Sequence, residues 1–375
     1  MLSFFAPAYI KEARLVLKNA HKLLHYKKDI LSEASLAGFK SAIARFEQAI
    51  KDRDRAAVEA AAQQLDKQWS QYLPPPADAG WRENCEVFLV AIVIAIGVRT
   101  FFLQPFTIPT GSMFPTLNGI MGYPSQQEPP NLARQIVDFA LRGRNYINVV
   151  AKSDDSIVAM GERKMLFFFT LTDVKCANGT YTVWAPADTL HRYFHVDVGN
   201  KYLAGDIIAR GAVDAGDHVF VDKVSYNLHS PHRGEVFVFS TRDISRIERG
   251  LRMQGVEGSQ FYIKRLAGVP FDTLRVDYPL LFVNGQEAPE FGFQRVMKDR
   301  ADGYEGYSNP SPSDAFYLTS ADATFTVPAE HYFAMGDNSF NSFDSRYWGP
   351  VPQDNLLGRG LFVYWPFLPH WGFVK

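Results

Sequence analysis

A serine stands in a backbone context that favours its use as a nucleophile. The segment from Gln104 to Leu117 reads QPFTIPTGSMFPTL, and it places Ser112 directly after Gly111. Glycine allows a tight turn beside the hydroxyl, and the nearby prolines restrict the backbone. Such a backbone can hold the hydroxyl of Ser112 in an accessible position. The alternative is an ordinary turn serine, which an isolated Gly-Ser pair would favour.

Lys264, in the run FYIKRLAGVP from Phe261 to Pro270, could supply the base that such a serine needs. A lysine in water has a pKa near ~10.4 and is protonated at neutral pH, but burial can lower that pKa by several units. In a strand, Tyr262 and Leu266 share the face of Lys264 and would cover it with apolar surface. Arg265 points to the opposite face and is expected to be structural. The alternative for Lys264 is an exposed lysine that protects a sheet edge.

Two further segments complete a pattern of four. Met335 to Pro350 reads MGDNSFNSFDSRYWGP and contains Ser342, and Gly216 to Ser225 reads GDHVFVDKVS. Together with the first two segments they resemble, in this order, the signature motifs of type I signal peptidases, the bacterial membrane-bound Ser-Lys proteases. The resemblance covers an apolar span with Phe101 to Leu117, and then roughly Gly216 to Pro366.

The resemblance implies a Ser-Lys dyad with Ser112 as the nucleophile and Lys264 as the base. Ser342 is expected to hydrogen-bond the lysine amine and to orient its lone pair toward Ser112. The backbone N–H of Ser112 and the hydroxyl of Thr110 would stabilise the oxyanion, and losing one such donor typically costs ~10²–10³ in rate. Three residues are expected to form a structural support network, namely Asp337, Asp344 and Arg346.

The resemblance also implies that an extended peptide binds by adding to exposed strand edges beside the serine. Phe106 to Thr110 would supply one edge and Tyr262-Ile263 the other, while Pro109 lacks an N–H donor and limits the pairing. Small apolar pockets for alanine at −1 and −3 are expected at Ile108, Met113, Phe106 and Ile263. Each of these side chains could equally belong to the core.

The sequence departs from the family pattern at several positions. Phe114 occupies a position often held by methionine, Ser339-Phe340 replace a charged pair, and Phe271 stands where glycine is usual. Gly336 is interpreted as a turn glycine. The main departure is an inserted lobe at residues 118–213, and the sequence leaves open whether it shapes substrate access, contacts the membrane or binds a partner.

One segment could cross a membrane. Cys85 to Leu103 contains an uninterrupted apolar run, Val87 to Val98, followed by Arg99. A run this short also fits a buried core helix. We expect a transmembrane helix at residues 84–103, because Arg99 near its end can reach the headgroups. The basic residues of the N-terminal region would stay inside, although the charge bias is weak and the orientation rests partly on the resemblance.

The N-terminal region, residues 1–80, is predicted to be helical and cytosolic. From about Lys11 to Tyr72, apolar residues recur every three to four positions among charged ones. Gly38 stands where a helical hairpin could turn, and Pro74-Pro75-Pro76 would end its second helix. Residues 1–10 are apolar, too short to span a bilayer, and could lie at its surface.

The remaining chain predicts a mainly β catalytic domain, residues 104–117 and 214–375, interrupted by an α+β lobe. Within the lobe, Asn131 to Arg142 predicts a short helix, and Asn178-Gly179 predicts a hairpin turn. Strands are predicted at 166–171, 181–185, 219–221, 236–239, 261–269, 273–276, 281–283 and 361–364.

Composition narrows the class of protein. A net charge of −1 gives no reason to expect nucleic acid, and 30 Phe with 17 Tyr favour a strand-rich body with apolar surface for lipid or peptide. The cysteines, Cys85 and Cys176, are badly placed to pair, and no run of residues has metal-ligand spacing. We therefore expect no disulfide, metal or cofactor.

We interpret the chain as a single-pass serine endopeptidase of the bacterial cytoplasmic membrane, with its catalytic domain on the outer face. It would cleave N-terminal signal peptides from exported preproteins, with those peptides and the lipid bilayer as partners and a contact with the secretion machinery left open. A self-cleaving Ser-Lys repressor is disfavoured because there is a span and no DNA-binding motif. A catalytically silent, membrane-tethered binding module or chaperone is disfavoured because all four site hydroxyl and amine groups are present.

Overall fold

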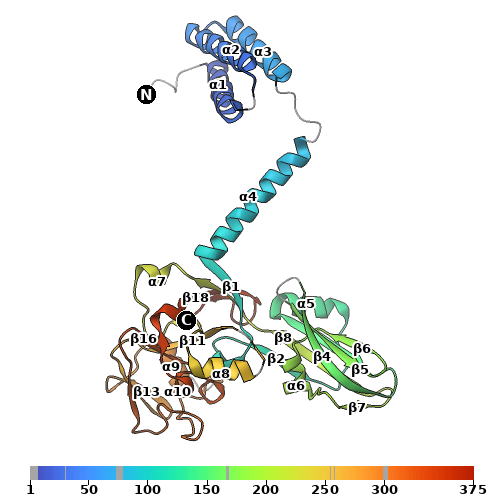
Figure 1. The fold of residues 1–375 in the computed structure, drawn as a ribbon, viewed down its shortest axis with the longest axis vertical. Helices are drawn as coiled ribbons and strands as arrows, with labels where there is room; N and C mark the ends of the chain where they lie inside the picture. The colour runs from blue at the N-terminus through green and yellow to red at the C-terminus, as the bar shows by residue number, and fades with distance from the viewer. Residues whose placement is uncertain are drawn as a thin grey trace. The chain divides into compact units, whose positions relative to one another are not determined.

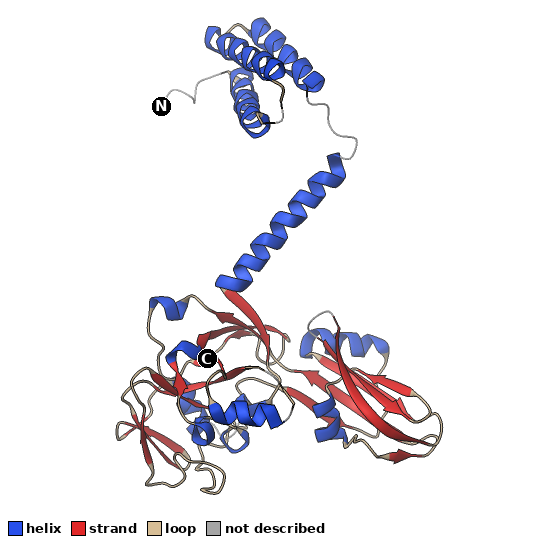
Figure 2. Cartoon of the chain, viewed as in Figure 1, coloured by secondary structure: helices blue, strands red, loops and turns tan. Residues whose placement is uncertain are grey.

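The structure is a computed structural model, and it describes residues 7–29, 31–72, 79–165, 169–253, 255–256, 258–298 and 303–375. The chain divides into two compact units, Met1–Val93 and Ile94–Lys375. Figure 1 follows the chain through both of them. Figure 2 shows that helices alone build the first unit, whereas the second is made largely of strands with short helices between them.

Three helices pack together in the first unit: α1 (Ala8–Lys27), α2 (Glu33–Asp52) and α3 (Arg55–Tyr72). The predicted two-helix hairpin is wrong, because Gly38 lies inside α2 rather than at a turn. One turn precedes Ser32, whose hydroxyl accepts a hydrogen bond from the Ser35 N–H and caps α2. The other turn is at Arg53, which adopts the left-handed conformation. The apolar faces of the helices meet around Phe46.

A long apolar helix, α4 (Ala79–Phe101), follows. Its residues Trp81–Phe101 are long and apolar enough to cross a membrane, with a mean hydropathy of 1.8. None of the most apolar stretch is buried, so the alternative of a buried core helix does not describe it. The helix begins earlier than the predicted residue 84. The predicted helix stop at Pro74-Pro75-Pro76 and the N-terminal residues 1–6 lie outside the described residues.

One antiparallel sheet forms the body of the second unit. Its strands are β1 (Leu103–Thr107), β9 (His218–Asp222), β10 (Val236–Ser240), β11 (Phe261–Gly268), β16 (His331–Met335), β17 (Val351–Pro352), β18 (Leu356–Trp365) and β19 (Gly372–Phe373). The order is β1-β9-β18-β10-β11-β16-β17, and β19 pairs with β18. Strands β9, β10, β11 and β18 confirm four of the predicted strands, whereas β16 was not predicted.

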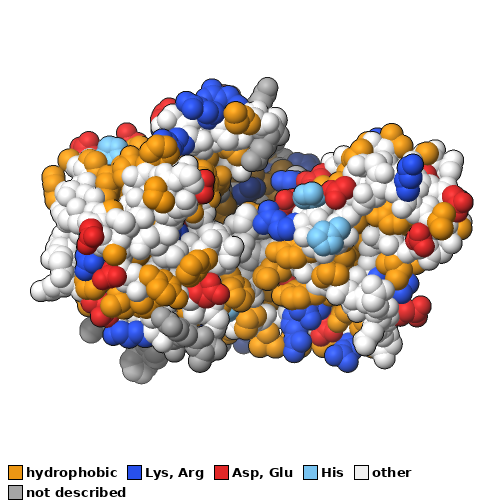
Figure 3. Space-filling view, turned by 90° about the horizontal axis from the view of Figure 1, so that it is seen from below, with side chains coloured by type: hydrophobic (Ala, Val, Ile, Leu, Met, Phe, Trp, Pro, Cys, Tyr) orange, Lys and Arg blue, Asp and Glu red, His pale blue; other side chains and the backbone are white. Residues whose placement is uncertain are grey.

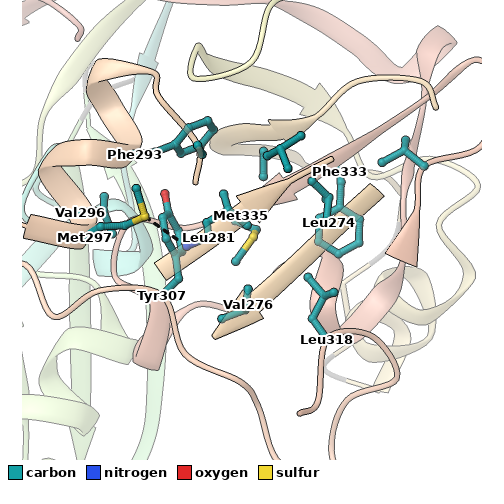
Figure 4. Packing of buried hydrophobic residues seen from close by; sticks show 14 of the residues in the cluster. Leu274, Val276, Leu281, Phe293, Val296, Met297, Tyr307, Leu318, Phe333 and Met335 are labelled. Carbon is teal, nitrogen blue, oxygen red and sulfur yellow. Dashed lines mark hydrogen bonds between the residues drawn. The ribbon is translucent and has the colours of Figure 1, made fainter. Parts of the chain in front are cut away.

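A smaller sheet supports one end of this body. It contains β14 (Gln286–Glu287), β13 (Leu280–Val283), β12 (Thr273–Asp277) and β15 (Thr324–Thr326), in that order, and is covered by α9 (Phe291–Lys298). An Asn284-Gly285 turn joins β13 to β14, with both residues at positive φ. Figure 4 shows side chains of α9, such as Phe293, gathered with Leu281 and with Met335 of β16 in one apolar cluster. This cluster anchors the strand that leads into the Ser342 segment.

The inserted lobe has two sheets and its own apolar cluster. One sheet pairs β2 (Ile120–Pro124), β8 (Ile207–Ala215) and β3 (Arg144–Val150). The other pairs β6 (Thr180–Val183), β5 (Phe169–Cys176), β4 (Asp155–Met165) and β7 (Lys201–Tyr202). The predicted hairpin turn at Asn178-Gly179 joins β5 to β6. The predicted strand at 166–171 is described only from Phe169 onward.

Several short helices complete the second unit: α5 (Leu132–Arg142), α6 (Ala187–Phe194), α7 (Ser225–Leu228), α8 (Ser245–Met253) and α10 (Ser345–Trp348). The predicted helix of the lobe is confirmed by α5. The side chain of Asn131 accepts a hydrogen bond from the Arg134 N–H at its start, and Gly143 ends it in the left-handed conformation.

Replacing Phe46 by alanine tests the packing of the first unit. The ring is 1% exposed, so its loss leaves a cavity and should cost about 3–5 kcal/mol of the free energy of unfolding. Thermal unfolding of the full chain, followed by far-ultraviolet circular dichroism, should show an earlier loss of helix. The matched control is Leu15→Ala in α1, where the side chain is 60% exposed. Equal effects of the two substitutions would contradict this packing.

Candidate active site

The backbone around Ser112 forms a tight turn directly after the first strand of the body. Gly111–Met113 make a single 3-10 turn, closed by the Phe114 N–H, which donates to the Gly111 carbonyl at 3.0 Å. The turn is supported from outside by Gly119. A Cβ at that position would lie 2.2 Å from the Thr110 carbonyl carbon, so only glycine can pack there. Ser112 itself is 7% exposed.

Strand β11 brings the predicted lysine to this serine. Lys264 Nζ donates to Ser112 Oγ at 2.5 Å, although the two residues are 152 positions apart. The lysine is 4% exposed, which excludes the alternative of a solvated edge lysine. Tyr262 shares its face as predicted, with Nζ 5.8 Å from the ring centre, and Leu266 on the same face is fully buried. The arrangement pairs a hydroxyl with an amine in a largely dry setting.

Burial lowers the pKa of Lys264 from 10.5 to about 8. The carboxylates of Asp344 and Asp337 act in the opposite direction, and the guanidinium of Arg346 lowers the pKa further. Desolvation is the largest of these effects. A substantial fraction of the amine is therefore neutral at mildly alkaline pH, so it can accept a proton.

Thr110 lies beside Ser112 on the exposed side of the turn. Its hydroxyl donates to Ser112 Oγ at 3.4 Å, a long contact, and its own side chain is open to the cleft. The Thr110 backbone is extended, so the residue continues the direction of β1 up to the turn. A threonine hydroxyl at this point can donate to an oxygen that develops charge next to Ser112.

Ser342 is close to the pair but does not make the predicted bond to Lys264. Its buried hydroxyl has no hydrogen-bond partner among the residues that the structure describes. It packs instead against Gly336: a Cβ there would lie 2.2 Å from Ser342 Oγ and 2.4 Å from the Ser112 carbonyl oxygen. The predicted bond is absent from this structure, in which the lysine amine is directed to Ser112.

The interpretation of Gly336 as a turn glycine is also corrected. Its φ is not positive, so conformational freedom is not what requires glycine there. Space is the reason, since any side chain would collide with Ser342 and with the Ser112 backbone. Gly336 therefore lets the last segment approach the serine turn closely.

Two buried ion pairs hold the strands around the site. Arg265 donates two hydrogen bonds to Asp337, at 2.7 and 2.6 Å, and both side chains are almost fully buried. Arg265 thus has the structural position predicted for it. Thr116, just after the serine turn, donates to the same aspartate at 2.5 Å. The pair links β11, the serine segment and the last segment at one point.

The second pair joins Arg346 to Asp344, with nitrogen–oxygen distances of 2.8 and 2.7 Å and no exposed surface on either side chain. Arg346 also donates to the backbone carbonyls of Ser308 and Ser339. Asp344 accepts from the Gly336 N–H at 3.0 Å. Every polar atom of such a buried pair needs a partner, and these bonds supply them.

Asn338 holds the serine turn, and the sequence did not single it out. Its backbone N–H donates to the Ser112 carbonyl at 3.1 Å, and its side-chain amide donates to the Gly111 carbonyl at 3.0 Å. Both carbonyls of the turn are thereby fixed by one residue. The only sequence signal was its place next to Asp337, which does not predict a contact with a segment more than two hundred residues away.

A cleft of about 630 Å³ opens beside Ser112. The predicted residues Phe106, Ile108, Tyr262 and Ile263 line it, together with Thr110 and Lys264. Met113 does not: it is fully buried in the apolar cluster beneath β1, β9 and β10, so its predicted role in a pocket is wrong. The 3-10 turn directs the side chain after the serine inward, away from the cleft.

Strand edges face the cleft from two sides. Strand β1 ends the sheet, so its edge opposite β9 is unpaired within the sheet. Strand β11 pairs with β16 only from Arg265 onward, which leaves one edge of Phe261–Lys264 free. The cleft therefore has room for an extended chain between two strands, close to the serine and the lysine. Among the described residues, no group of histidine, cysteine or acidic side chains is placed to hold a metal ion.

Known proteins match this chain over the catalytic body. Residues 209–365 match the family described as signal peptidase, peptidase S26. Probable signal peptidase I-1 of Synechocystis sp. is 31% identical over 172 residues, which are 46% of this chain and 73% of that protein. Signal peptidase I of Leptolyngbya laminosa is 30% identical over 41% of this chain. The chain belongs to the signal peptidase family, peptidase S26.

The match does not extend over whole proteins. It covers 63% of the Leptolyngbya protein and 56% of probable signal peptidase I-2 of Synechocystis sp., which is 33% identical. A solved signal peptidase I from Enterococcus faecalis V583 aligns over 35% of this chain and 97% of its own, with 25% identity and a TM-score of 0.25. The 209–365 match includes Lys264 and Ser342 but not Ser112.

The buried pair between Arg265 and Asp337 should be essential for stability. Asp337→Asn leaves a buried guanidinium without its counter-charge, and we expect a loss of about 3–5 kcal/mol in the free energy of unfolding. Asp173→Asn breaks an exposed pair with Arg163 and is the matched control, with little expected change. Chemical denaturation of both variants measures the difference. Similar midpoints would contradict the structural role of the buried pair.

Proposed function

We propose that this chain is a membrane-anchored serine endopeptidase that removes N-terminal signal peptides from exported preproteins. The observation that supports this most directly is the 2.5 Å contact between Lys264 Nζ and Ser112 Oγ at the end of a cleft. Membership of the signal peptidase family points to the same reaction. The relatives named signal peptidase I and thylakoidal processing peptidase agree with it.

In the proposed reaction, the neutral amine of Lys264 takes the proton from Ser112 Oγ as that oxygen attacks the scissile carbonyl carbon. The carbonyl oxygen becomes an oxyanion and accepts hydrogen bonds from the Ser112 N–H and the Thr110 hydroxyl. The protonated lysine then donates its proton to the leaving amine, and the peptide bond breaks. Water, deprotonated by the same lysine, hydrolyses the ester and regenerates Ser112.

Ser342 fits the role of orienting the lysine in the reacting complex. Its hydroxyl is buried near the Ser112 backbone and has no partner among the described residues, so it remains available to the amine. A rotation of the Lys264 amine would direct one of its N–H groups at Ser342. The lone pair of Nζ would then face Ser112 Oγ. The residue would then act through the lysine and would not touch the substrate.

The substrate would lie as an extended strand between β1 and the first half of β11. Apolar side chains of Phe106, Ile108 and Ile263 would form small pockets beside it, which favours small residues before the cut. Helix α4 would anchor the chain in the bacterial cytoplasmic membrane, with the N-terminal unit inside and the catalytic body outside. Nothing in the described part of the chain supports a contact with the secretion machinery.

A catalytically silent binding module explains these observations less well. A module that only binds peptides has no need for a lysine that is buried, partly neutral and directed at a serine hydroxyl. Burying such an amine costs stability, because the charged form loses its hydration. A module that only binds peptides would gain nothing from this cost. The enzyme is therefore the better proposal.

Ser112→Ala and Lys264→Ala should each reduce cleavage of a preprotein by detergent-solubilised enzyme by at least about 10²–10⁴-fold, since each removes one half of the proton-transfer pair. Lys298→Ala, where the lysine is 60% exposed, is the control and should cleave normally. A metal chelator should have no effect. Processing at the wild-type rate by either site variant would contradict the assignment of Ser112 and Lys264 as the catalytic pair. Inhibition by the chelator would contradict a metal-independent reaction.

The pH dependence of the reaction should report the lysine. The active form is the neutral amine, and its pKa of about 8 means that this form is lost as the pH falls. We expect kcat/KM to rise about tenfold per pH unit below pH ~8 and to level off above it. The measurement is kcat/KM for a fixed preprotein between pH ~6 and ~9.5. A profile that is flat, or that falls as the pH rises, contradicts a neutral lysine as the base.

A further inference from the structure

The inserted lobe contributes one wall of the cleft that we assign to the substrate. Arg192 and Tyr193 of α6 line it, together with Met121 of β2. Figure 3 shows a face with a hollow in it, where Lys, Arg and His side chains gather on one rim next to acidic ones. The lobe is thus part of the binding site, although its sequence lies outside the family motifs.

Close glycine contacts fix this wall relative to the nucleophile. Gly119 packs on the backbone of Thr110, and the chain then enters β2, where the Ile120 N–H donates to the Pro109 carbonyl at 3.4 Å. Three residues after Gly119, a Cβ on Gly122 would lie 2.7 Å from both Tyr193 Cβ and the Phe194 ring. Helix α6 is therefore connected to the serine turn through one short strand.

The direction of the strands indicates which part of the substrate meets this wall. Strand β1 leaves α4 and runs toward Ser112, and the free half of β11 also runs toward the site, from Phe261 to Lys264. A peptide that comes from the membrane and reaches Ser112 between these edges has its residues before the cut along them. Residues after the cut lie beyond Ser112, where β2 and α6 follow from the serine turn.

Arg192 is the charged side chain that this wall presents to the cleft. Of the charged side chains that line the cleft within the described residues, Lys264 is buried and Arg192 is exposed, and no acidic side chain lines it. Arg192 pairs with Asp188 at 3.0 Å, but both side chains are more than half exposed. An exposed pair of this kind is weak, so the guanidinium can be shared with an incoming carboxylate.

We propose that α6 of the inserted lobe binds the first residues after the cut, and that Arg192 selects substrates with an acidic side chain there. This inference rests on the proposed function, because it assigns a specificity to the same cleft. An aspartate or glutamate would take part of the Arg192 contact from Asp188, whereas a lysine at the same place would be repelled.

The test compares preproteins that differ in one charge. Aspartate or lysine is placed at each of the first five positions after the cut, and separately at exposed positions before it, and kcat/KM is measured with the full-length enzyme. We expect an aspartate after the cut to be cleaved about three- to fivefold faster than a lysine at the best position, with the difference shrinking at high salt. Charges before the cut should have little effect.

Charge reversal of the enzyme supplies the controls. Arg192→Glu should reverse the preference, so that the lysine substrate becomes the faster one, with both rates expressed relative to a substrate that is neutral at that position. Arg163→Glu is the matched control, because Arg163 has the same 58% exposure, lies in the same lobe and is also ion-paired, yet does not line the cleft. Its preference should equal that of the wild type.

Three results would overturn the inference: no charge preference in the wild-type enzyme, the same preference in Arg192→Glu, or a preference that depends on positions before the cut. Each leaves the proposed function intact, provided that the neutral substrate is cleaved and that Ser112→Ala abolishes cleavage. Failure of the wild-type enzyme to cleave any preprotein would instead remove the proposed function, and the inference with it.

Discussion

The whole site depends on keeping one amine away from water beside one hydroxyl. Lys264 is 4% exposed and its Nζ lies 2.5 Å from Ser112 Oγ, and loss of hydration is the largest cause that lowers the pKa of this amine. Removing a charged lysine from water is unfavourable. Without other contacts that offset this cost, β11 would separate from the serine turn and expose the amine. The surrounding structure is best understood as the set of contacts that prevents this.

Those contacts come from three segments far apart in the sequence. Arg265, next to Lys264, is locked to Asp337, and Asn338 beside that aspartate fixes both carbonyls of the serine turn. The second pair, Asp344 with Arg346, holds Gly336 against Ser342. Successive residues of β11 therefore lie on opposite faces: one face carries the Lys264 amine, and the other carries Arg265, which is paired with Asp337.

The sequence was informative where one residue type or one periodicity determines the outcome. The strand period predicted that Tyr262 covers Lys264 and that Arg265 turns away, and local sequence patterns predicted the helix at Asn131 to Arg142 and the hairpin turn at Asn178-Gly179. Asn338 could not be predicted, because its amide bonds depend on two segments meeting in space. Gly38 misled because glycine is tolerated inside a packed helix, at about 1 kcal/mol, when neighbouring side chains are buried. The predicted bond between Lys264 and Ser342 is absent because the amine has several possible partners. Which of them it contacts depends on the assembled site and cannot be derived from the sequence.

The lobe is inserted where the chain can accommodate it without disturbing the dyad. Its entry, Gly119, packs on the Thr110 backbone, and its exit, Gly216, adopts a positive φ and approaches so closely that a Cβ would lie 2.4 Å from the Ile108 carbonyl oxygen. Both ends of the insertion are therefore held against the strand that leads to the serine. Because the side chains of Tyr262 and Leu266 that share the face of Lys264 belong to the body, the lobe can carry different sequence at the rim of the cleft without changing that face. If the lobe selects the substrate as we propose, then selectivity and protection of the amine belong to different parts of the fold, so either can change without the other.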